Sequence, residues 1–293
     1  MKLLYNLLFT LSLLTLPFEA WAFIPNFKMI MSRTAENHGK GLYQIIQDVA
    51  LESEPKNLVI RETWYIKDGN QMRLEVKGRN QLKDLVNIAF IYNGNRRTYI
   101  DSRGIKKVSR PGSDWFEPYF HFRFQKNIKP MMVTAKMAPI EILEDDNKNK
   151  GTHFNPENPR KEQPFLRLSR VGGTVAWAIG YPTPRGSNKA LPGMWIEQDQ
   201  FLIRKLRFPS QTVISANSYS RHSRKLKLPS FIKINLDGER QIQIQVVRVN
   251  PLPLTKKNKE LLSEDSLDFS KDPSLALKIP KLKPIIEFYK RFR

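Results

Sequence analysis

The chain has 293 residues, a formal net charge of +21 and no cysteine. The absence of cysteine excludes disulfide bonds, thiolate metal sites and a lipid anchor on an N-terminal cysteine, so the core alone has to hold the fold. The high positive charge favours acidic partners, and a basic surface that only keeps the protein soluble is the alternative.

The first 22 residues follow the order of a cleavable export signal. Lys2 gives a positive start, Leu3 to Leu16 is an almost unbroken apolar run, and Ala20-Trp21-Ala22 places small residues at the −3 and −1 positions. The alternative is an uncleaved membrane anchor, but spanning the hydrocarbon core takes about 20 apolar residues. We therefore expect a signal peptide over 1–22 and a mature protein in the periplasm.

The first half of the mature chain predicts a helix followed by a β-meander. Pro25 to His38 has apolar residues at near-helical spacing, and glycines follow it. Apolar and polar residues then alternate, with tight turns between the runs, and turns this short join antiparallel strands. The expected strands are 43–51, 58–66, 72–77, 86–92, 96–100 and 105–108.

The alternation stops between 111 and 164, which we interpret as a helical and loop insertion. Asp114 to Phe124 is densely aromatic, and Met131 and Met132 follow it. Asp145 to Pro164 is polar and interrupted by prolines, which predicts a long surface loop. The aromatic part is the best candidate to cover the apolar face of the sheet. The residues leave open whether it fills the core or leaves room for a ligand.

The second half returns to alternation and ends in a basic tail. Asp237-Gly238 predicts the last hairpin turn, and the β domain is expected to end near residue 254. The basic tail is expected over 255–293, and its last segment, Lys281 to Arg293, either lies on an anionic membrane or packs on the sheet. We count eleven to twelve strands in the whole chain, and those of this half are 165–171, 174–180, 194–197, 201–208, 212–219, 231–236 and 241–249.

No sequence motif points to catalysis, and we expect neither enzyme activity nor a cofactor. The four histidines form no metal-binding pattern, and no nucleophile elbow or phosphate-binding loop is present. Acidic pairs such as Asp145-Asp146 fall in polar segments, where nothing would raise a carboxyl pKa for acid–base work. Export argues against nucleic acid as a partner.

Several short segments resemble the outer-membrane lipoprotein-sorting superfamily. Met194 to Arg204 resembles its Trp-Ile-Asp strand pair, Leu228-Pro229 its Leu-Pro strand start, and Val247 to Asn250 the end of its domain. The resemblance covers about Asn26 to Pro253. It implies a LolA/LolB/RseB-like fold, an incomplete and strongly curved antiparallel half-barrel whose concave apolar face is closed by a helical lid and receives acyl chains.

The preferred function is therefore a non-enzymatic periplasmic carrier or sensor of a lipid or acylated lipoprotein. Inward alternation selects the residues expected to contact the acyl chain, which are Trp64, Ile66, Met72, Leu74, Ile88, Phe90, Trp177 and Ile244. The lid is expected to contribute Phe116, Phe120 and Met132. A basic loop between two strands is assigned to the head group through Arg221, Arg224 and Lys225, although a solvated hairpin loop is the simpler interpretation.

The alternative function is an interaction or scaffold protein. In that case the sheet core would be fully packed, and the basic surface would dock an acidic polymer, an anionic membrane or a partner protein of the cell envelope.

Overall fold

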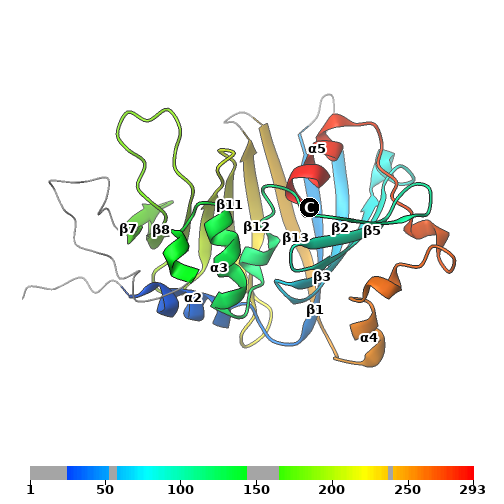
Figure 1. The fold of residues 1–293 in the computed structure, drawn as a ribbon, viewed down its shortest axis with the longest axis horizontal. Helices are drawn as coiled ribbons and strands as arrows, with labels where there is room; N and C mark the ends of the chain where they lie inside the picture. Colours follow the sequence, from blue (N-terminus) through cyan, green and yellow to red (C-terminus); the bar gives the residue numbers. More distant parts are fainter. Residues whose placement is uncertain (1–24, 53–57, 144–164, 237–239) are drawn as a thin grey trace, which may run out of the picture.

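A single antiparallel sheet forms most of the protein (Figure 1). The computed structural model describes residues 25–52, 58–143, 165–236 and 240–293. The expected signal segment, the whole polar loop at 145–164 and the Asp237-Gly238 turn lie outside these described residues. The sheet has thirteen strands, one for each alternating run of the sequence, although eleven to twelve strands were expected in all.

The strands of the first half follow one another as expected from the alternation. They are β1 (Leu42–Leu51), β2 (Leu58–Asp68), β3 (Gln71–Gly78), β4 (Asn87–Asn93), β5 (Arg96–Ile100) and β6 (Lys106–Ser109). Those of the second half are β7 (Leu166–Val171), β8 (Thr174–Ile179), β9 (Gly193–Glu197), β10 (Ile203–Arg207), β11 (Val213–Arg221), β12 (Lys227–Leu236) and β13 (Arg240–Leu252).

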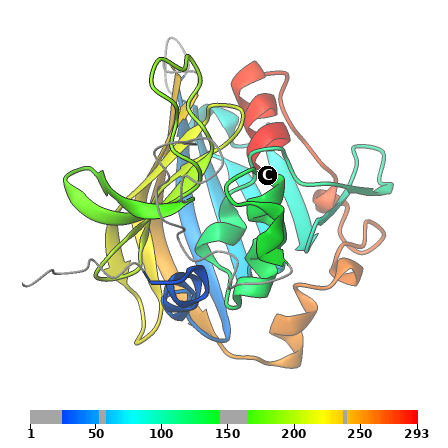
Figure 2. The same ribbon diagram turned by 60° about the vertical axis from the view of Figure 1, so that its left-hand side comes forward.

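The two halves join through the pairing of the first strand with the last. The strand order is β6-β5-β4-β3-β2-β1-β13-β12-β11-β10-β9-β8-β7, so each half is a meander and the edges are β6 and β7. The edge strands do not pair with each other, and the sheet is therefore not closed into a barrel. Figure 2 shows the two ends of the sheet to the left and to the right of the helices. This confirms the predicted curved, open antiparallel fold with helices on one face.

Three helices cover one face of the sheet, and their buried residues belong to one continuous apolar cluster with the strands. They are α2 (Phe27–Glu36), α3 (Gln125–Thr134) and α5 (Lys283–Phe292). The side chain of Asn26 caps α2 by accepting from the backbone N–H of Met29. Helix α5 begins with Pro284 in its first turn and buries four residues at helical spacing, Ile285, Phe288, Tyr289 and Phe292.

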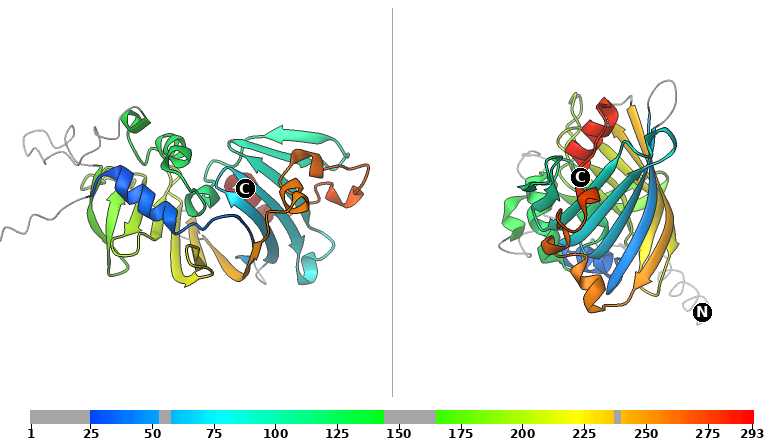
Figure 3. Two further views of the ribbon diagram at one scale, coloured as in Figure 1. Left: turned by 90° about the horizontal axis from the view of Figure 1, so that it is seen from below. Right: turned by 90° about the vertical axis from the view of Figure 1, so that its right-hand side faces the viewer.

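The last forty residues pass from one face of the sheet to the other. Helix α4 (Lys256–Glu260) and the residues after it lie on the face opposite the other helices, where Leu267 packs on Ala89 and Ile91. Lys278 then pairs with Asn87 at the end of β4. Beyond this bridge the chain reaches the opposite side as α5, and Figure 3 shows the tail, in orange and red, on both sides of the strands. Among the described residues, no helix is long and apolar enough to cross a membrane.

His38 couples the end of α2 to the insertion and predicts a pH dependence of stability. Its Nδ1 lies 2.7 Å from the backbone oxygen of Phe122, and burial lowers its pKa to about 3. In the unfolded chain the His38 imidazole takes up a proton near pH 6.5, whereas in the folded chain it does so only near pH 3. Between these values His38 should therefore lower the free energy of unfolding by about 1.4 kcal/mol per pH unit as the pH falls. Urea unfolding of the wild type and His38→Gln across this range tests the slope, which should be shallower in the variant.

Candidate functional site

The residues expected to contact an acyl chain all lie on the face covered by the helices. Each side chain of this set is exposed by 3% or less, and the set consists of Trp64, Ile66, Met72, Leu74, Ile88, Phe90, Trp177 and Ile244. The three expected lid residues, Phe116, Phe120 and Met132, are equally buried and belong to the same apolar cluster. The structure thus brings the two sets together in one core. Their role in ligand contact stays a prediction.

The end of helix α5 packs on two residues of this face. The ring centroids of Phe292 and Phe116 lie 6.3 Å apart, and those of Phe292 and Phe288 lie 5.6 Å apart. The guanidinium carbon of Arg293 lies 5.2 Å from the centre of the Trp64 ring and 5.0 Å from that of Phe116. The segment that the sequence presents as a basic tail therefore covers Trp64 and Phe116, two of the residues expected to contact a ligand.

A buried ionic cluster holds the end of α5. Both carboxylate oxygens of Glu62 accept hydrogen bonds from Arg293, at 3.0 Å from Nε and 2.9 Å from Nη2. Glu62 also accepts hydrogen bonds from Gln47, Trp64 and Tyr289. Both partners of the pair are fully buried. A buried charge without a partner is costly, so this pair ties α5 to β2.

Glu117 from the insertion completes the cluster. Its Oε1 lies 3.2 Å from Nη1 of Arg293, close enough for an ion pair although not in hydrogen-bond geometry. Burial alone would lower the pKa of Arg293, but the charges of Glu62 and Glu117 outweigh it and raise that pKa above its usual value. Burial opposes the charge of Glu117 as well, and the charge of Arg293 keeps the pKa of this carboxyl low.

Backbone contacts fix the last turn of α5 in the same place. The N–H of Gly112 donates to the carbonyl of Arg293, and the N–H of Asp114 to that of Arg291, both at 3.0 Å. The Nη1 of Arg97 lies 2.6 Å from the Arg293 carbonyl oxygen. These donors satisfy carbonyls that have no partner within a helix. Gly112 permits the approach, because a Cβ at this position would overlap the carbonyl group of Arg291.

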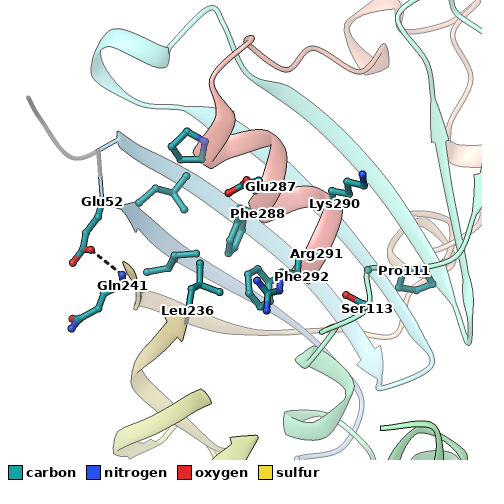
Figure 4. Close-up of a pocket in the computed structure, with 14 residues that line it drawn as sticks. Glu52, Pro111, Ser113, Leu236, Gln241, Glu287, Phe288, Lys290, Arg291 and Phe292 are labelled. Atoms are coloured by element: carbon teal, nitrogen blue, oxygen red, sulfur yellow. Dashed lines mark hydrogen bonds between the residues drawn. The ribbon is translucent and has the colours of Figure 1, made fainter. Parts of the chain in front are cut away.

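A cavity remains between α5 and the ends of β1, β12 and β13 (Figure 4). We call it the α5 cavity, and its volume is about 520 Å³. The backbone N–H of Gln241 donates to the Glu52 carboxylate at its rim, at 2.8 Å. Apolar side chains form most of its wall, namely Leu51, Pro111, Leu236, Ile242, Pro284, Phe288 and Phe292. Polar side chains lie around them, namely Glu52, Ser113, Gln241, Glu287, Lys290 and Arg291.

The sequence-predicted residues do not line this cavity. The expected trough residues lie elsewhere on the same face. Arg221 is exposed at the end of β11, and Arg224 and Lys225 are exposed in the connection from β11 to β12. In that strand pair Arg221 faces Lys227, whereas Val213 faces Asn235 at the other end. The basic loop is therefore separated from the cavity by the length of β11, roughly 25 Å. The structure does not bring the proposed head-group residues to the cavity.

Sequence reasoning missed Glu62 and Gln47 of the ionic cluster, as it missed the residues that line the α5 cavity. Both occupy inward positions of the alternation, Glu62 between Ile60 and Trp64, and Gln47 between Ile45 and Val49. A charged residue at an inward position predicts a buried partner of opposite charge. This signal was present in the printed sequence, although the partner, Arg293, could not be named from it.

Neither a metal-binding group nor the buried carboxylates belong to the α5 cavity in the described residues. Within the described part of the chain, no group of three or more His, Asp or Glu residues could hold a metal ion. The buried carboxylates of Glu62 and Glu117 face Arg293 and do not line the α5 cavity. What the cavity presents is an apolar wall with polar groups at its border.

Comparison with known proteins finds similarity only at the level of structure. No protein-family model and no curated protein matches the chain. A LolA superfamily protein from Nitrosomonas europaea is 9% identical, with 83% of this chain and 100% of that chain covered and a TM-score of 0.51. An outer membrane lipoprotein-sorting protein domain from Vibrio parahaemolyticus is 10% identical, with 83% and 97% covered and a TM-score of 0.49. A DUF1329 family protein from Desulfovibrio piger is 9% identical, with 82% and 97% covered and a TM-score of 0.48. The likeness to the Nitrosomonas europaea protein confirms the fold predicted from the sequence, and the chain has a LolA-like fold.

Proposed function

We propose that this protein binds an acyl-bearing ligand, a lipid or an acylated lipoprotein, without catalysing a reaction. The observation that carries the proposal is the α5 cavity, which has a mainly apolar wall and a volume of about 520 Å³. Pockets for small molecules commonly measure about 300–1,000 Å³ and combine apolar walls with a few polar groups. A hydrocarbon chain matches such a wall, because each buried methylene contributes about 0.8 kcal/mol.

The border of the α5 cavity suits an acidic head group. Lys290 lies on the exposed side of α5 and lines the cavity. Arg291 lines it as well, but its guanidinium is held by Asp114, with Nε 2.6 Å from the carboxylate. Lys290 is therefore the better candidate to meet a phosphate or carboxylate at the entrance.

Helix α5 is proposed to compete with the ligand for the hollow face. At its end, the guanidinium of Arg293 lies over the rings of Trp64 and Phe116, and Phe292 packs on Phe116. Trp64 and Phe116 are two of the residues predicted to contact an acyl chain. Displacing α5 would join the α5 cavity to the rest of this face and lengthen the site. In this proposal the C-terminal segment acts as an internal occupant that keeps the apolar face covered until a ligand replaces it.

The export pattern of 1–22 and the LolA-like fold support a periplasmic location for this activity. A role as carrier and a role as sensor both require reversible binding of the apolar chain, and the site described here serves either.

Filling the α5 cavity with a larger side chain should abolish binding. Leu236 lines the cavity at the end of β12, so Leu236→Trp places an indole in the space proposed for the chain. Displacing only two methylenes of the ligand weakens binding about tenfold. Titration of the mature protein with a fluorescent fatty acid should therefore show at least this loss. Val247→Trp is the matched control, because Val247 lies in β13, is 52% exposed and does not line the cavity. Equal affinity of both variants and the wild type would refute the proposal.

A further inference from the structure

Two cations lie over one tryptophan, and a third belongs to the same row of residues, on the face of the sheet that faces away from the helices. Arg167 of β7 pairs with Ala178 of β8, which pairs with Trp195 of β9, which pairs with Lys205 of β10. Side chains of paired residues point to the same face of a sheet, so these four residues form one row across four strands. Arg207, two residues after Lys205, lies on the same face. We call Arg167, Trp195, Lys205 and Arg207 the Trp195 patch.

The cations of this patch are held close together by the indole and by backbone oxygens. The Lys205 ammonium lies 5.0 Å from the centre of the Trp195 ring, and the Arg207 guanidinium lies 5.1 Å from it. Arg207 donates to the carbonyl of Leu191, and Arg167 donates to that of Gly180. The indole is only 8% exposed, because the cations cover it.

No carboxylate balances these charges among the residues that the structure describes. Glu197 lies nearby on β9, but Arg204 holds its carboxylate, with Nε at 2.8 Å. Burial lowers the pKa values of Arg167 and Lys205, and the charge of Arg207 lowers both further. Like charges held together in this way attract an anion more strongly than separated surface lysines do.

Exposed apolar residues adjoin the Trp195 patch. Tyr181 and Leu191 lie at the two ends of the segment that joins β8 and β9, and they are 43% and 37% exposed. Tyr181 directly follows Gly180, whose carbonyl accepts a hydrogen bond from Arg167. The carbonyl of Leu191 itself accepts a hydrogen bond from Arg207. Cations beside exposed aromatic and aliphatic side chains are the combination that suits the interface of a membrane.

The Trp195 patch and the α5 cavity lie at the same end of the sheet. Arg207 pairs with Val213, and Val213 pairs with Asn235, the neighbour of the cavity residue Leu236. The two features thus share one end of the strands but lie on opposite faces of the sheet.

We infer that the Trp195 patch docks this protein on an anionic phospholipid surface. The patch neutralises lipid phosphates through its three cations, and Tyr181 and Leu191 enter the head-group layer beside it. The inference goes beyond the proposed function and does not depend on it, because the patch lies on the face opposite the α5 cavity wall.

The test is co-sedimentation of the mature protein with vesicles of phosphatidylcholine, alone or mixed with phosphatidylglycerol. The wild type should bind only the mixed vesicles, and its binding should fall steeply with added salt. A triple variant that removes all three charges of the patch should bind the mixed vesicles on the order of a hundredfold more weakly. It carries Arg167→Gln, Lys205→Gln and Arg207→Gln. The matched control removes the same charge from the far end of β11 and should bind like the wild type. It carries Arg221→Gln, Arg224→Gln and Lys225→Gln.

Three results would overturn the inference. They are failure of the wild type to bind the mixed vesicles, equal losses in the two triple variants, and binding that is insensitive to salt. If the first triple variant does not fold, Tyr181→Ser with Leu191→Ser provides the same test, because both side chains are exposed. That double variant should also bind more weakly, and unchanged binding would equally refute the docking surface. Uptake of the fluorescent fatty acid without vesicles reports on the α5 cavity separately.

Discussion

Replacing Glu62 with glutamine is expected to lower the free energy of unfolding by about 3–5 kcal/mol. The carboxylate lies on the buried face of β2 and accepts two hydrogen bonds from Arg293, which is itself fully buried. Glutamine has nearly the same size, so the loss reports on charge rather than on packing. Glu117 would remain beside the guanidinium, with its Oε1 3.2 Å from Nη1.

Urea unfolding at neutral pH measures this change directly. Glu36→Gln is the control, because it removes the same charge from an exposed pair with Arg33, and such pairs contribute about 0–1 kcal/mol. A double variant with Arg293→Met should recover part of the loss, since it removes the cation that Glu62→Gln leaves without its main partner. A loss for Glu62→Gln no larger than that of the control would show that the ionic cluster does not hold α5.

Gly112→Val should release the end of α5 and increase uptake of an apolar probe. A Cβ at this position overlaps the carbonyl groups of Lys290 and Arg291, both backbone, so no side-chain rotation relieves the overlap. The last turn of α5 then loses the hydrogen bond from the N–H of Gly112. If this release lets the protein bury two further methylenes of the ligand, the affinity for the ligand should rise about tenfold.

Fatty-acid titration and limited trypsin digestion together read out this change. Cleavage within α5, at Lys290 or Arg291, should become faster than in the wild type. Cleavage elsewhere in the chain should keep its wild-type rate. Gly94→Ala is the control, because its Cβ meets no atom and the cost is confined to a turn with positive φ. Loss of uptake by a folded Gly112→Val protein would contradict the role of α5 as a competing occupant and make it a required wall of the site.

Local pattern was enough to predict the strands and the helix near the N-terminus. In β2, for example, Ile60, Trp64 and Ile66 alternate with outward residues, and the structure buries all three. Apolar alternation reports directly on which face of a strand is buried, so it survives folding of the whole chain.

The site was harder to predict because distant segments build it. The α5 cavity needs β1, β12 and β13 at one end and a helix that follows them by some thirty residues. In α5 the spacing of Ile285, Phe288 and Phe292 is helical. The many lysines and arginines of this segment nevertheless favoured its interpretation as a charged tail. The position of Arg221 relative to the cavity depends on strand pairing, which composition does not reveal.

The central claim, that an apolar chain binds beside α5, is tested most directly by native mass spectrometry of gently purified mature protein. The account predicts an added mass of one lipid or fatty acid per chain, which Leu236→Trp reduces and Val247→Trp retains. Protein that carries no such mass, and that acquires none when incubated with a fatty acid, would contradict the claim.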